Sequence, residues 1–131
     1  MSGLRTYSTA QFEIRIADGL LEMRTEGLRT PDMGAEPQRA MESLFKDVSV
    51  RAVAFDIRAS DFRITNVELE SRVRQIGRQC RGLPIAFISR DDQKDQIRIA
   101  LGAIGQMNGI ARGFRSRDKA HAWLREVSRP A

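Results

Sequence analysis

The chain has 131 residues, of which 41% are hydrophobic and 30% are charged, proportions typical of one globular domain. A single cysteine excludes an intramolecular disulfide and any metal site built from several cysteines. No apolar run approaches the roughly 18 residues of a membrane-spanning helix, and residues 1–10 lack the apolar segment of a signal peptide. We therefore expect one cytoplasmic domain over residues 1–131, with its packed core at about residues 12–127.

Charge is distributed unevenly along the chain. The net charge is +5, but residues 1–70 carry nine basic and twelve acidic side chains, whereas residues 71–131 carry thirteen basic and five acidic ones. An ordinary solvated surface explains this asymmetry. The alternative is a contact site for an anionic partner or for the acidic half of a second copy.

The first predicted elements form an antiparallel hairpin. Residues 12–16, Phe-Glu-Ile-Arg-Ile, alternate apolar and charged side chains, which is the period of a half-buried strand. Asp18 and Gly19 supply a turn because both tolerate a positive φ, and residues 20–25 continue as the second strand. We expect residues 1–10 and the last three or four residues to be frayed.

Helices and buried strands alternate in the middle of the chain. A helix is expected from about Glu36 and Pro37, since proline suits the first helical turn, and its apolar stripe extends to Val48. Residues 50–57 form a nearly continuous apolar run, typical of a strand covered on both faces. We expect a loop through residues 60–62 to follow it.

The next helix has a clear beginning and end. Thr65 and Glu68 have the spacing of a capping box, in which each side chain accepts from a backbone N–H of the other residue. Cys80 falls on the apolar face of this helix, and Gly82 ends it. The remaining predicted elements are a strand at 83–89, a helix at 91–107, a strand at 110–114 and a helix at 117–127.

The predicted order is ββαβαβαβα, an α/β fold. Strands that alternate with single helices indicate a mostly parallel sheet with right-handed crossovers and helices packed on it. The N-terminal β-hairpin adds antiparallel pairing, so we expect a mixed sheet.

Three segments resemble a known family. Val53–Ile57 as the central strand, Phe62 after it, and the closing Phe114–Leu124 are similar to the SpoIIAA-like group of the STAS family, the anti-sigma-factor antagonists, sometimes joined with Sec14-type lipid carriers. The resemblance implies a SpoIIAA-like fold and a regulatory, non-enzymatic role in binding another protein or a second copy of this chain. The alternative that it implies is a carrier of a small apolar or lipidic ligand, which needs a cavity of some hundreds of cubic ångströms.

The resemblance also points to a candidate site. In regulatory STAS proteins, the loop after the central strand carries an Asp-Ser-Ser-Gly motif in which a serine is phosphorylated. The matching residues 64–67 are Ile-Thr-Asn-Val, so the motif is absent and Thr65 supplies the only hydroxyl group there. A helix cap explains this hydroxyl, and a phosphorylation site is the alternative. The candidate regulatory or partner-binding loop comprises Asp56, Ser60, Asp61, Thr65 and Asn66.

The sequence carries little catalytic chemistry, and we expect no enzyme activity, cofactor or metal site. His121 is the only histidine and is expected at a partly exposed position, while glycine-rich phosphate loops are absent. Cys80 is expected to be buried and inert. Asp56, Asp61 and Arg63 near a strand end leave an unrecognised enzyme as a third hypothesis, although turn formation also explains these aspartates.

Nucleic acid is not an expected partner. Several arginines share the helix that begins after Thr65, but at 100° per residue Arg72 and Arg74 point to different sides of it. Binding of a phosphate backbone needs such charges on one face.

Overall fold

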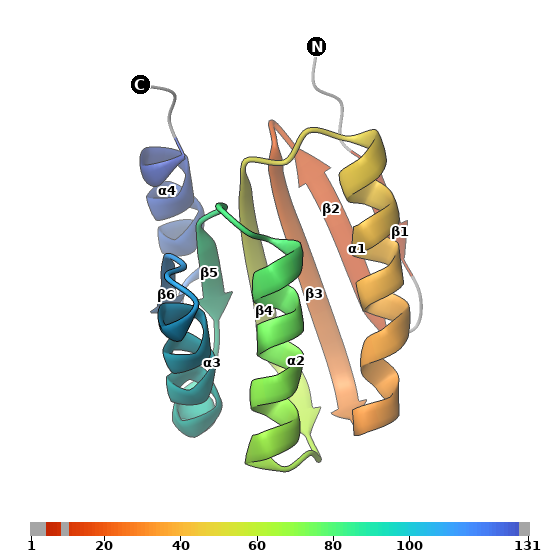
Figure 1. The fold of residues 1–131 in the computed structure, drawn as a ribbon, viewed down its shortest axis with the longest axis vertical. Helices are drawn as coiled ribbons and strands as arrows, with labels where there is room; N and C mark the ends of the chain where they lie inside the picture. The colour runs from red at the N-terminus through yellow and green to blue at the C-terminus, as the bar shows by residue number, and fades with distance from the viewer. Residues whose placement is uncertain (1–4, 9–10, 129–131) are drawn as a thin grey trace.

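The computed structural model describes residues 5–8 and 11–128, which form one sheet with helices on both of its faces (Figure 1). Its strands are β1 (Arg5–Ser8), β2 (Phe12–Ala17), β3 (Leu20–Arg29), β4 (Ala52–Phe62), β5 (Ile85–Ile88) and β6 (Ala111–Phe114). Its helices are α1 (Ala35–Asp47), α2 (Asn66–Gln79), α3 (Lys94–Gln106) and α4 (Arg117–Val127), with short 3-10 helices η1 (Pro31–Gly34) and η2 (Asp91–Gln93). None of the described helices has both the length and the hydropathy needed to cross a membrane.

The strands stand in the sheet in chain order. β1, β2 and β3 pair antiparallel, and β3, β4, β5 and β6 pair parallel. Asp18 and Gly19 have positive φ angles of 54° and 77° in the turn between β2 and β3, a conformation that glycine adopts freely because it lacks a Cβ and that aspartate tolerates. The predicted mixed, mostly parallel sheet with an N-terminal hairpin is confirmed.

One strand, β1, lies where fraying was expected. Thr6 pairs with Arg15 and Tyr7 with Ile14, and the Tyr7 ring stacks on Phe12 with 5.6 Å between ring centroids. The fraying prediction is wrong for residues 5–8, because backbone pairing to the free edge of β2 holds a segment that has no hydrophobic period of its own. The rest of that prediction, for residues 1–4, 9–10 and 129–131, lies outside the described residues.

β4 is longer than the sequence predicts. It has 11 residues and continues to Phe62, so the expected loop through residues 60–62 is wrong. The extension is held by β3, which pairs with it from Glu26 opposite Ala59 to Arg29 opposite Phe62, beyond a register shift between Arg24 and Glu26. This extension is polar and pairs with a neighbouring strand on one side only. It therefore lacks the continuous apolar run by which a central strand is recognised in a sequence.

The size of the side chains on each face of β4 explains which helices cover that face of the sheet. Val53 and Phe55 point to one face, where α1, α2 and α3 cover the main core and Phe55 stacks on Phe87. Ala52 and Ala54 point to the other face, where their small side chains let α4 approach the sheet. Alternation along a strand therefore assigns three helices to one face and one helix to the other.

The closing strand and helix pack as predicted, with one exception. Ala120 and Leu124 are buried against the sheet, and the half-buried Trp123 packs on Phe114 with 5.7 Å between ring centroids. Val127 is exposed, although it follows Leu124 by three residues and so lies on the same side of the helix. The reason is that the stripe of α4 contacts the sheet only as far as Leu124.

Two helical glycines offer a test of the packing between α2 and α3. A Cβ at Gly77 would lie 2.8 Å from Met107 Sδ and 3.0 Å from Ile104 Cδ1, whereas a Cβ at Gly102 would meet nothing within 4 Å. We expect Gly102→Ala to raise the free energy of unfolding by about 1 kcal/mol through helix propensity. The same gain at Gly77 is offset by overpacking of about 1–3 kcal/mol, so Gly77→Ala should be neutral or destabilising. Urea unfolding of both variants checks this, and equal stabilisation by the two would contradict the close packing at Gly77.

Candidate functional site

Two residues of the candidate loop are buried parts of β4. Asp56 accepts hydrogen bonds from the backbone N–H of Arg58 at 3.1 Å and from its guanidinium at 3.0 and 2.9 Å. Ser60 is fully buried, with its Oγ 2.6 Å from Thr25 Oγ1 and its carbonyl accepting from Gln93 Nε2 at 3.0 Å. Both side chains are committed to internal partners. They therefore support the end of the strand and present no surface to a partner.

The other three candidate residues are exposed where β4 leads into α2. Asp61 forms an exposed ion pair with Arg63 at 3.4 Å, and Thr65 and Asn66 begin the helix. Since Asp56 is buried beneath Arg58, the two aspartates do not face a common site. The structure thus does not assemble the carboxylate pair on which the enzyme hypothesis rests.

Exposed apolar side chains accompany these polar residues. Val67 is 77% exposed in the first turn of α2, and Leu28, which pairs with Asp61 across β3 and β4, is 52% exposed. We call Leu28, Asp61, Thr65, Asn66 and Val67 the β4–α2 surface. Val67 was not among the predicted site residues. It lies off the apolar face of α2 that begins at Leu69, and this position marks it as an outward-facing residue.

Thr65 has the capping role that its spacing predicts. Its Oγ1 accepts from the Glu68 N–H at 3.1 Å, and Glu68 Oε1 accepts from the Thr65 N–H at 2.9 Å. These hydrogen bonds lower the pKa of the Glu68 carboxyl. The hydroxyl of Thr65 therefore satisfies an otherwise unpaired donor at the beginning of α2.

Removal of this cap gives a measurable loss. We expect Thr65→Ala to lower the free energy of unfolding by about 1 kcal/mol, because the Glu68 N–H loses its acceptor, while Thr65→Ser retains most of the stability. Urea unfolding compares the two variants with the wild type. A Thr65→Ala protein as stable as the wild type would show that the cap contributes nothing.

A cluster of charged and polar side chains around the buried Glu22 ties α4 to the sheet. Glu22 of β3 accepts from Arg117 Nε at 2.8 and 3.0 Å, and its Oε2 lies 3.1 Å from His121 Nε2. Burial alone would raise the pKa of Glu22, but the hydrogen bonds and charges of His121 and Arg117 lower it to about 2. The sequence predicted neither the burial of Glu22 nor this role of His121, because the pairing joins residues almost a hundred positions apart.

The Glu22 cluster predicts a loss of stability in acid. The folded pKa of about 2 lies below the ordinary 4.5, so the contribution is fully present above pH 4.5 and is lost as the pH falls toward 2. We expect that loss to be roughly 2 kcal/mol. Glu22→Gln should be less stable by a similar amount at neutral pH and approach the wild type near pH 2. Urea unfolding between pH 2 and neutral pH tests this prediction, with Glu126→Gln, an exposed position on α4, as the control. If the stability of Glu22→Gln changed with pH as the stability of the wild type does, the prediction would be contradicted.

The remaining reactive side chains take no part in a site. Cys80 is buried in the main core, and burial raises the pKa of its thiol to about 12, so it stays protonated and unreactive at neutral pH. Among the described residues, no three His, Cys, Asp or Glu side chains are placed to hold a metal ion. Arg72 and Arg74 diverge as predicted, Arg72 toward η1 and Arg74 toward Glu70.

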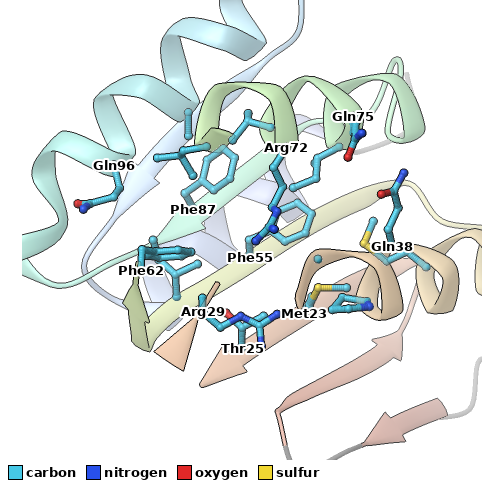
Figure 2. A pocket seen from close by; sticks show the side chains of 18 of the residues that line it. Met23, Thr25, Arg29, Gln38, Phe55, Phe62, Arg72, Gln75, Phe87 and Gln96 are labelled. Atoms are coloured by element: carbon cyan, nitrogen blue, oxygen red, sulfur yellow. The ribbon is translucent and has the colours of Figure 1, made fainter. Parts of the chain in front are cut away.

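A pocket lies beneath the three helices that cover the main core (Figure 2). Its volume is about 100 Å³, and its apolar lining includes Met23, Phe55, Phe62 and Phe87. Two arginines, Arg29 from β3 and Arg72 from α2, also line it. We call this space the helix-side pocket. No motif predicts it, because its residues come from separate strands and helices.

No family model matches the sequence, and no curated protein matches it. The solved structures are more informative. An uncharacterised protein of the DUF3478 family with a SpoIIAA-like fold, from Shewanella loihica PV-4, aligns over 93% of this chain and 92% of its own, with 14% identity and a TM-score of 0.60. An anti-sigma factor antagonist from Mycobacterium paratuberculosis aligns over 94% and 95%, with 16% identity and a TM-score of 0.61.

The fold is SpoIIAA-like. This confirms the resemblance carried by the central strand and by the closing strand and helix. A more distant likeness, with a TM-score of 0.50 and 9% identity, joins 97% of this chain to 76% of an enoyl-CoA hydratase from Geobacillus kaustophilus HTA426. At these identities the comparisons establish the architecture alone.

Proposed function

We propose that this protein is a regulatory, non-enzymatic domain that binds another protein through the β4–α2 surface. The observation that carries the proposal is Val67, which stands 77% exposed beside the exposed Thr65 and Asn66. An apolar side chain ringed by polar groups is the arrangement found at the centre of protein interfaces. The likeness to a protein named as an anti-sigma factor antagonist supports a protein partner.

The binding that we propose does not depend on phosphorylation. The Asp-Ser-Ser-Gly motif is absent, and the hydroxyl of Thr65 is engaged in the cap of α2. Asp61 and Arg63 supply opposite charges at the edge of the surface, where they favour specificity over affinity. A partner would therefore cover Val67 and Leu28 and pair with these charges around them.

Site-specific photo-crosslinking tests this surface. A benzoylphenylalanine at position 67 should give discrete adducts with one partner in cells that express the protein at its native level. The same group at position 110 is the matched control, because Ile110 is 61% exposed at the opposite end of the strands. Adducts that are identical from positions 67 and 110, or none from position 67, would contradict the proposed surface.

The uneven charge of residues 1–70 and 71–131 favours a second copy of this chain as the protein partner. Sedimentation velocity from about 50 mM to about 1 M NaCl detects this self-association, since contacts between oppositely charged surfaces weaken as salt screens them. A monomer at every salt and protein concentration would leave a different protein as the partner.

The second candidate function is carriage of a small apolar ligand, and the helix-side pocket favours it. Its volume of about 100 Å³ is below the roughly 300–1,000 Å³ of sites for larger ligands. A full-length lipid chain does not fit such a space. The candidate ligand is therefore a small molecule.

A further inference from the structure

Arg29 is a buried cation without a counter-ion. It is 3% exposed, and none of the described carboxylates lies within ion-pairing distance of it. Its guanidinium donates to two backbone carbonyls, Met33 O at 3.0 Å and Gln11 O at 3.4 Å. Buried charges in proteins are normally paired, because removal from water costs several kcal/mol.

A second guanidinium shares this environment. Arg72 Nη2 donates to Pro31 O at 2.6 Å and Thr30 O at 3.4 Å, so both arginines are held by carbonyls of the segment that contains η1. Asp32 and Glu68 are the carboxylates that act on Arg72, but their hydrogen bonds go to Thr30 and Thr65. Figure 2 shows Arg29 and Arg72 directed into the pocket from β3 and from α2.

Two further groups in the lining lack partners. The Oε1 atoms of Gln79 and Gln96 are buried without a hydrogen bond from any described residue. Buried polar atoms are nearly always satisfied by protein or by a bound molecule. These amide oxygens accept hydrogen bonds, as a carboxylate also does, so they do not pair with such a ligand. The group that calls for an anionic occupant is the buried Arg29, which has no ion pair with a described carboxylate.

We propose that the helix-side pocket binds a small organic carboxylate. Arg29 and Arg72 hold the carboxylate, since guanidinium groups match its two oxygens and each retains free N–H donors. The apolar part lies against Phe55 and Phe62, which line the same space. A volume of about 100 Å³ limits the ligand to about four carbons, given that a cavity of about 150 Å³ accepts the six carbons of benzene.

This inference is independent of the partner-binding function. The pocket lies between the sheet and the helices, whereas the β4–α2 surface faces outward. Failure of carboxylate binding would leave the protein-binding proposal standing, and crosslinking at position 67 would be unaffected by it.

Titration calorimetry with butanoate is the first experiment. We expect 1:1 binding with a Kd of about 1 mM or tighter, and at least about tenfold weaker binding of butanamide, which has the same shape without the charge. Dodecanoate should bind no better than butanoate, because the pocket cannot hold the longer chain. Methyl NMR signals of Met23 and Met41, which line the pocket, should shift on binding.

Three variants locate the binding groups. Arg72→Met should weaken the binding of butanoate at least about tenfold, as should Arg29→Met. Gly34→Ala should also weaken it while retaining both charges, because a Cβ there would lie 2.6 Å from Arg72 Nε and 2.7 Å from its Cζ and displace that guanidinium. Arg78→Gln is the matched control, since Arg78 is exposed on the same helix and does not line the pocket.

The possible outcomes distinguish a variant that fails to fold from a pocket that fails to bind a carboxylate. If Arg29→Met fails to fold, Arg72→Met and Gly34→Ala decide the question, since Arg72 and Gly34 are less buried than Arg29. The proposal is overturned by any of three results: no butanoate binding at millimolar concentration, equal binding of butanamide, or binding that Arg72→Met leaves unchanged.

Discussion

The pairing of β4 with β3 on one side and β5 on the other is the constraint on which the rest of the molecule depends. β4 pairs with β5 from Val53 to Asp56, and with β3 from Ala52 to Phe62. Because the register is fixed on both sides, every residue of the first half of β4 has an assigned face. Phe55 must point into the main core, and Ala54 must point toward α4.

The second half of β4 places both sites of interest. Beyond Asp56 the strand has lost β5 as a partner, and it continues beside β3 to Phe62. Phe62 lines the helix-side pocket, and Asp61 belongs to the β4–α2 surface. The extension therefore brings an outward surface and an inward pocket to the same end of the sheet.

Helix α2 carries residues of both the β4–α2 surface and the helix-side pocket. Its first turn presents Thr65, Asn66 and Val67 to solvent, and Arg72, two turns along, reaches the pocket. Two different physical demands act on this helix: its cap satisfies backbone donors at the beginning, and its inner face packs on α3 through Gly77. The Glu22 cluster joins α4 to the sheet in addition to the apolar contacts of Leu124 and Trp123.

Features with a local cause could be predicted from the sequence. Alternation defined β2, the Asp18–Gly19 turn defined the hairpin, and the Thr65–Glu68 spacing defined the beginning of α2, because each depends on residues a few positions apart. The mixed, mostly parallel α/β sheet also followed, since the order of strands and helices restricts the topology. The SpoIIAA-like fold was implied by the family resemblance of the central strand and the closing segment.

Features that join distant residues could be seen only in the folded chain. β1 and the end of β4 are strands because a neighbouring strand offers backbone partners, and their own patterns do not require it. The burial of Glu22 between Arg117 and His121, and the meeting of Arg29 with Arg72, arise from packing across the chain. Local periodicity reports which face of an element is apolar, but it carries no information on which charged groups meet across two elements. For that reason the candidate loop was predicted by position, while its buried half and the arginine pocket emerged only from the fold.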